Sequence, residues 1–182
     1  NALGNHLGIW DFYYKRKFNK KELKLYYQHF FEDTSGLRFD NKSDGLWGLE
    51  LSNYIRNTNL LFEYLNTTNQ NQDPPYVEDY YYHHYQYPGG WSYKEYVIGN
   101  PFINAGNYSN SNPSKVFHIG IGNHEIDEYN YQLLFSRKTN TSDSIKYKIV
   151  FGKMVDKLLV DIFIVSEEDQ KNIIGLKLSY LL

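Results

Sequence analysis

Apolar and polar residues alternate with a period of two along most of this chain. Leu23, Leu25 and Tyr27 are separated by single residues of a more polar kind, and Trp47 and Leu49 repeat the pattern after a polar interval. Successive side chains on a β-strand point to opposite sides, so this alternation predicts strands with two different faces. Eleven such segments can be marked, with the approximate bounds Leu7 to Lys15, Glu22 to Phe31, Asp44 to Ser52, Asn57 to Asn66, Tyr80 to Tyr87, Trp91 to Ile98, Lys115 to His124, Tyr129 to Arg137, Ser144 to Phe151, Asp156 to Val165 and Asn172 to Leu182.

The connections between these segments alternate in length. Short links follow the odd-numbered segments, and longer polar stretches follow most of the even-numbered ones, the longest being 32–43, 67–79 and 99–114. In an up-and-down meander every second connection lies at the same end of the sheet. The sequence therefore predicts short turns at one end and long loops at the other, an arrangement typical of outer-membrane barrels.

The segments also have the length of membrane-crossing strands. Most contain about 9 to 11 residues, which a tilted strand needs to cross a bilayer. A soluble sandwich would show the same alternation with its apolar face turned inward, but long strands and one-sided loops favour the barrel. One predicted face is apolar or aromatic throughout: Leu25, Tyr27, Trp47, Leu49, Leu60, Phe62, Tyr64, Phe117, Ile119, Ile121, Ile145, Tyr147, Ile149, Leu158, Val160, Ile162, Ile164, Leu176, Leu178, Tyr180 and Leu182.

The expected fold is all-β, an antiparallel up-and-down meander of about eleven strands that forms the C-terminal part of an outer-membrane β-barrel. Bacterial single-chain barrels have even strand numbers, so eleven strands indicate that further strands precede Asn1. The chain starts without Met, a basic region or an apolar signal segment, which is expected of a processed or excised piece. Residues 1–182 are thus interpreted as a single domain fragment.

Composition narrows the function. A formal net charge of −2 without a basic stripe argues against a nucleic-acid partner. The absence of Cys excludes disulfides and thiolate sites. Aromatic residues make up 18% of the chain, and Tyr dominates them; amphipathic rings suit membrane interfaces and sugar-binding surfaces alike.

Candidate catalytic and metal chemistry is weak. His83 and His84 are adjacent, so on a strand they would point to opposite faces, and the Tyr-rich run around them is better interpreted as an aromatic girdle. Glu32, Glu50 and Glu63 share the polar face but lie at different heights, and they are interpreted as luminal charges balanced by lysines. Those lysines are Lys24, Lys146, Lys148 and Lys177. No phosphate loop, nucleophile elbow or metal motif is found, so neither a cofactor nor a metal is expected.

The longest loops are rich in Asn, Gln, Ser, Tyr and Asp, as in NTTNQNQDPPYVED and NPFINAGNYSNSNPS. Amide and carboxylate groups bind sugar hydroxyls, and aromatic rings stack on the C–H face of a sugar. Solvated loop tips have the same composition, so both interpretations stay open at this point.

Four motifs, in order, carry a family resemblance. They are GNHLGIWDF, QHFFEDTSGLRF with DGLWGLEL, EYLNTTNQ, and HHYQYPGGWSYKEYVIGNPF, and together they resemble the capsule-assembly Wzi family in its Bacteroidetes-like form. The likeness is dense from Gly4 to about Asn104 and thinner beyond. It implies a non-enzymatic, lectin-like outer-membrane barrel that binds exopolysaccharide at its extracellular face.

The resemblance and the strand parity together give a candidate site. Family motif positions at 4–6, 32–36 and 99–101 fall at the long-loop end, whereas Trp91 and Tyr93 are expected near the turn end in a structural role. The expected partners are capsular or exopolysaccharide and outer-membrane lipid, and the barrel is expected to be monomeric. A diffusion channel and a secreted carbohydrate-active β-sandwich are the alternatives. The residues expected to bind glycan are Asn5, His6, Glu32, Asp33, Ser35, Arg38, Asn66, Asn69, Asp73, Tyr76 and Asn100.

Overall fold

One long antiparallel sheet dominates the protein. The computed structural model describes residues 7–31, 39, 41, 43–69, 81–82, 90–93, 96–98, 100, 102–103, 113–123, 129–139, 143–167 and 170–180. Within them, nine strands pair in the order β1-β2-β3-β4-β7-β8-β9-β10-β11. Their bounds are β1 Gly8–Phe18, β2 Lys21–Phe31, β3 Gly45–Ile55, β4 Thr58–Asn66, β7 Lys115–Asn123, β8 Tyr129–Thr139, β9 Ser144–Val155, β10 Leu158–Glu167 and β11 Gln170–Tyr180.

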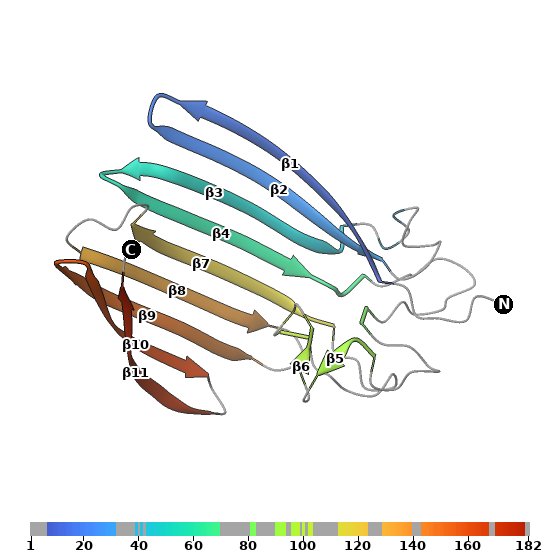
Figure 1. Cartoon of the computed structure of the whole chain (residues 1–182). Coiled ribbons are helices and arrows are strands. Elements are labelled where there is room, and N and C mark those ends of the chain that lie inside the picture. The colour runs from blue at the N-terminus through green and yellow to red at the C-terminus, as the bar shows by residue number, and fades with distance from the viewer. Residues whose placement is uncertain are drawn as a thin grey trace.

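The predicted all-β meander is confirmed, since every pair of neighbouring strands in this sheet is antiparallel. Figure 1 shows the strands side by side, with β10 and β11 curving round at one edge. The described part of the chain contains no helix long and apolar enough to span a membrane.

Two of the eleven expected strands are not part of the sheet. β4 pairs directly with β7 from Thr58 to Asn66, so no strand lies between them. The expected strand at 80–87 has Tyr81 and Tyr82 in a turn, and its remaining residues lie outside the described ones. The expected strand at 91–98 is instead a small separate hairpin of β5 (Ser92–Tyr93) and β6 (Tyr96–Val97). Residues 67–114 are therefore one insertion between two adjacent strands.

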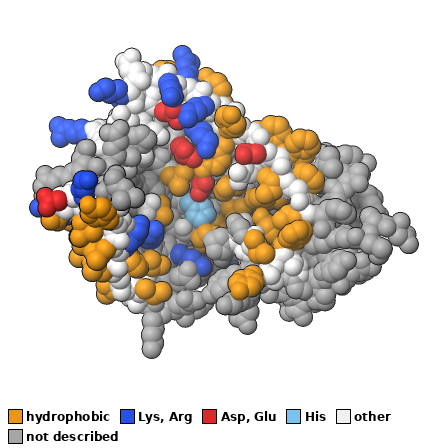
Figure 2. Space-filling view, in the orientation of Figure 1, with side chains coloured by type: hydrophobic (Ala, Val, Ile, Leu, Met, Phe, Trp, Pro, Cys, Tyr) orange, Lys and Arg blue, Asp and Glu red, His pale blue; other side chains and the backbone are white. Residues whose placement is uncertain are grey.

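The strand register keeps a continuous row of apolar and aromatic residues on one side of the whole sheet. Trp47 lies opposite Tyr27 on β2 and Tyr64 on β4, and Tyr64 lies opposite Phe117 on β7. Ile149 on β9 continues this face opposite Ile164 on β10. The large side chains of this face are mostly exposed, which the predicted faces anticipate. We call this side the outward face and the other side the polar face. Figure 2 shows acidic and basic side chains gathered around a hollow in the middle of the molecule.

The two longest connections lie at the same end of the sheet, as predicted. Two-residue turns at Asn19–Lys20, Arg56–Asn57 and Asp156–Lys157 lie at one end, where β7 and β8 are also joined by 124–128. The opposite end carries the connections 32–44, 67–114, 140–143 and 168–169. In Figure 1 the two-residue turns lie on the left, and the ends of β2 and β4 that lead into the long connections lie on the right. We call these the turn end and the loop end.

The main buried core lies at the loop end on the polar face. Phe30, Leu65 and Val116 come from β2, β4 and β7, and their side chains are buried against residues of the insertion. The outward face is exposed and forms no core. The apolar residues of β2, β4 and β7 on the polar face therefore pack against the insertion. Their partners there are Tyr81, Tyr82, Val97 and Ile103.

Three glycines in the sheet lie beneath aromatic rings of the neighbouring strand. A Cβ at Gly48 would meet the ring of Tyr26, and one at Gly175 would meet the ring of Phe163. Gly8 and Phe31 form the third such pair. The rings cover backbone that a glycine leaves open, which stabilises strands where glycine would otherwise weaken them.

The turn between β3 and β4 allows a stability prediction. Arg56 has a φ of 42° and Asn57 a φ of 63°, so Arg56 adopts a left-handed conformation that is strained by its Cβ atom. We expect Arg56→Gly to raise the free energy of unfolding by about 0.5 to 1 kcal/mol, as measured by denaturant titration. Lys20→Gly, in the turn between β1 and β2, is the control. Lys20 is not among the described residues with positive φ, so this change should be neutral or destabilising, and equal gains from both variants would contradict the prediction.

Candidate functional site

A buried carboxylate organises the loop end. Asp44 immediately precedes β3 and is fully buried. Its Oδ2 accepts a hydrogen bond from the Tyr81 hydroxyl at 3.1 Å, and both carboxylate oxygens lie 3.0 Å from the backbone nitrogen of Asn69. Asp44 therefore joins the start of β3 to two positions in the insertion after β4. A buried carboxylate that keeps its donors holds such segments firmly, because losing a donor leaves a charge without compensation.

The main chain of Asp44 joins the same network. Its carbonyl oxygen accepts the Tyr27 hydroxyl at 2.8 Å and lies 3.0 Å from Nδ1 of His29. A carbonyl only accepts, so this geometry places the imidazole proton on Nδ1. The His29 ring stacks on Phe39 with centroids 4.3 Å apart. His29 is thus a buried structural side chain.

Asn41 forms the next layer of this network. Its amide nitrogen donates to the Phe30 carbonyl at 3.2 Å and to the Tyr81 hydroxyl. The backbone carbonyl oxygen of Asn41 accepts the backbone N–H of Asp44 at 3.2 Å. Oδ1 of Asn41 is buried and has no hydrogen-bond partner within the described residues.

The insertion begins and ends at adjacent positions. The Thr67 N–H donates to the Ser114 carbonyl at 2.9 Å, and the Ser114 N–H donates to Oγ1 of Thr67 at 2.8 Å. This pair extends the ladder between β4 and β7 by one step. The insertion therefore starts and finishes at the loop end, and none of its described strands joins the nine-stranded sheet.

Part of the insertion lies over the polar face. The ring of Phe102 meets His118 edge-on, with centroids 4.8 Å apart, and the ammonium of Lys146 lies 5.2 Å from its centroid. The Phe102 carbonyl accepts the ammonium of Lys138 at 3.1 Å and the Ser114 hydroxyl at 3.0 Å. Since these partners belong to the polar face or its edge, the insertion covers the loop end of that face.

Aromatic side chains are exposed on the hairpin of β5 and β6. Trp91 is 40% exposed and Tyr93 is 67% exposed. The backbone N–H of Trp91 donates to the Tyr82 carbonyl at 2.8 Å, so the hairpin is joined to the buried residue Tyr82. The expectation that Trp91 and Tyr93 lie near the turn end is wrong, because their hairpin is joined to Tyr82 in the buried core. They lie at the loop end instead.

The interpretation of the Tyr-rich run as an outward-facing aromatic girdle is also wrong for the residues that the structure describes. Tyr81 and Tyr82 are buried in the core, where they contact Phe30. His83 and His84 lie outside the described residues.

Charged groups on the polar face are paired only in part as expected. Lys24 and Glu50 are opposite each other on β2 and β3, and their charged atoms lie 3.2 Å apart. Lys15 and Glu22 are 2.7 Å apart. Glu63, which was expected to be balanced by a lysine, instead accepts a hydrogen bond from the Tyr26 hydroxyl. No group of three or more potential metal ligands lies together in the described part of the chain.

Three of the eleven predicted glycan-binding residues are described. The side chains of Asn66 and Asn100 are buried, and each Oδ1 accepts a backbone N–H two residues later, from Thr68 and Phe102 respectively. Asn69 lies closer to solvent and donates from Nδ2 to Ser43 at 3.4 Å. The other eight lie outside the described residues: Asn5, His6, Glu32, Asp33, Ser35, Arg38, Asp73 and Tyr76.

A family comparison decides the identity. The family model for the capsule assembly protein Wzi matches residues 1–118. The chain belongs to the Wzi capsule assembly family. This match covers β1 to β4, the whole insertion and the first part of β7, so the predicted Wzi resemblance is confirmed. Searches among curated proteins and solved structures gave no match.

Sequence reasoning did not identify Asp44, Asn41 or Tyr81 as the organising residues of this Wzi family member. Asp44 stands at the start of a strand, beside the glycine of the DGLWGLEL motif, where an acidic residue is ordinarily solvated. The available signal was its place inside a motif of the Wzi resemblance. Its partners are 25 and 37 residues away, which local patterns do not reveal.

The Asp44 network predicts the effect of removing one hydroxyl. We expect Tyr81→Phe to destabilise the loop end by about 1 to 3 kcal/mol, because the buried carboxylate loses a donor. The readout is protease cleavage within 67–114, which should become faster while the strands stay intact. Tyr54→Phe, at an exposed position of β3, is the matched control and should leave cleavage unchanged. Equal cleavage of Tyr81→Phe and the unaltered protein would contradict this role of Asp44.

Proposed function

We propose that this protein resides in the outer membrane, binds exopolysaccharide at its loop end and thereby helps to retain capsule on the cell surface. The role is one of binding and assembly, without catalysis. The observation that carries the proposal is the exposed apolar face that runs unbroken across nine strands. Membership of the capsule assembly family supplies the biological setting.

The outward face supports a membrane location. Soluble monomers rarely expose contiguous apolar patches larger than a few hundred Å². Here all nine strands contribute, and they contain 9 to 12 residues each, the length expected of tilted membrane strands. Leu176, Leu178 and Tyr180 on β11 are each more than half exposed. In a soluble sandwich this face would be covered by a second sheet, and the described residues contain no such sheet.

The chemistry of the loop end supports glycan binding. Trp91 and Tyr93 present exposed rings there, and flat rings stack on the C–H faces of sugars. The surrounding connections are rich in amides and hydroxyls, which suit sugar hydroxyls. The Asp44 network fixes the insertion that bears these groups, and a preorganised surface binds a glycan with less loss of conformational entropy.

The insertion also favours a binding protein over a diffusion channel. Phe102 and the buried core occupy the loop end of the polar face, where solute would have to enter. A porin-like function would need that region to be open.

Adjacent residues on β9 test the membrane location. We expect Ile149→Arg, which places a charge near the middle of the outward face, to cost about 2 to 4 kcal/mol of folding free energy in lipid. Lys148→Arg, on the polar face, is the control and should be neutral. The measurement is denaturant unfolding in lipid vesicles, combined with the amount of protein in the outer-membrane fraction. Equal tolerance of the two changes would contradict a lipid-facing outward surface.

Loop substitutions test the glycan role. We expect a variant with Asp33, Arg38, Asp73 and Tyr76 changed to Ala to bind purified capsular polysaccharide roughly tenfold or more weakly, because several hydrogen bonds are lost together. Cell-bound capsule should fall in parallel while capsule released to the medium rises. The control carries Asp156→Ala and Lys157→Ala at the turn end. Unchanged retention by the loop variant, at normal surface levels, would rule out these residues as the site.

A further inference from the structure

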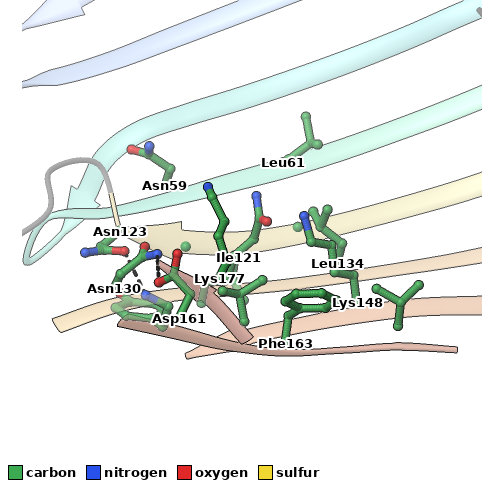
Figure 3. A pocket seen from close by; sticks show the side chains of 16 residues that line it. Asn59, Leu61, Ile121, Asn123, Asn130, Leu134, Lys148, Asp161, Phe163 and Lys177 are labelled. Carbon is green, nitrogen blue, oxygen red and sulfur yellow. Dashed lines mark hydrogen bonds between the residues drawn. The ribbon is translucent and has the colours of Figure 1, made fainter. Parts of the chain in front are cut away.

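A hollow lies at the turn end of the polar face. It has a volume of about 670 Å³ and is lined by side chains from β4 and from β7 to β11. Figure 3 shows these side chains around one space, which exists because β10 and β11 curve round toward the strands at the centre of the sheet. The residues that matter for its chemistry are Asn130, Gln132, Lys148, Asp161, Phe163 and Lys177.

One row of residues across four strands sets its geometry. Asn130 on β8 lies opposite Gly152 on β9, which lies opposite Asp161 on β10, which lies opposite Lys177 on β11. A Cβ at Gly152 would come 2.0 Å from Oδ1 of Asp161, so only glycine leaves room for that carboxylate. Across this gap Nδ2 of Asn130 donates to Oδ1 of Asp161 at 2.9 Å, as Figure 3 shows.

The hollow contains polar groups that the protein does not satisfy itself. Asp161 is only 4% exposed, and within the described residues Asn130 is the one group that donates to its carboxylate. Gln132, Lys148 and Lys177 have no hydrogen-bond or ionic partner in the part of the chain that the structure describes, and both lysines are exposed to solvent. Several donors, a carboxylate acceptor and the apolar ring of Phe163 therefore converge on one space.

The charges define the ligand. Two ammonium groups face a single carboxylate, so the lining has an excess of positive charge and favours an anion. The Asp161 carboxylate, in contrast, needs donors such as hydroxyl groups. A ring bearing both a carboxylate and hydroxyls satisfies both demands, and its C–H face can lie against Phe163. We propose that this hollow binds an acidic sugar residue of the uronate class.

The test uses the full chain purified in detergent, with sodium glucuronate, glucose and sodium acetate as separate probes in saturation-transfer NMR. Glucuronate should bind more tightly than either glucose or acetate. Lys177→Met and Asp161→Asn should each weaken glucuronate binding by about tenfold, because each removes a charge-assisted contact. Lys157→Met, in the turn between β9 and β10, is the matched control and should have no effect.

Three results would overturn the proposal: equal binding of all three probes, glucuronate binding that survives both variants, or its loss in the loop variant described above. The last result would place the sugar at the loop end. Conversely, glucuronate binding that persists in the loop variant but fails in Lys177→Met assigns it to this hollow. The loop-end function and this site can therefore fail independently of each other.

Discussion

Strand register is the constraint on which the rest of the structure depends. Because side chains alternate along each strand, a slip of one residue between any two strands would turn one strand's apolar side chains onto the polar face. The observed register avoids this across all nine strands, so that Tyr27, Trp47, Tyr64 and Phe117 form one outward row. The same register aligns Lys24 with Glu50 on the other side. One set of backbone pairings therefore creates both the apolar outward face and the charged polar face.

The apolar residues of the outward face are exposed and form no buried core. The core lies at the loop end instead. The insertion brings Tyr81, Tyr82, Val97 and Ile103 against the polar-face residues at the ends of β2, β4 and β7. Apolar packing alone would fix its position weakly, since it is nondirectional. The buried hydrogen bonds to Asp44 are directional, and they specify how the insertion meets the sheet. Packing supplies stability here, and the polar network supplies orientation.

The sequence predicted the strands better than the insertion, for a physical reason. Alternation is a property of a single strand facing two environments, so nine strands and their faces could be recognised locally. The Tyr-rich segment at 80–98 alternates too. To join the sheet, however, it would need to pair with β4, and β4 already pairs with β7. Strand pairing over such a distance leaves no local signal. Asn66 and Asn100 show the same limit: their composition suggested sugar binding, whereas their burial and turn contacts depend on the folded chain.

The polar groups at the two ends of the polar face are hydrogen-bonded to different extents. At the loop end, polar groups are buried under the insertion and satisfy one another, as Asp44 and Tyr81 do. At the turn end the described connections are two-residue turns, which are too short to reach over the face. Polar groups there satisfy one another only partly: Asn130 reaches Asp161 across the space left by Gly152, while Lys177 finds no protein partner among the described residues. The ammonium of Lys177 is exposed, so water or a ligand can take up the hydrogen bonds that the protein leaves open. The turn end of the face is therefore where we propose that this fold binds an acidic sugar.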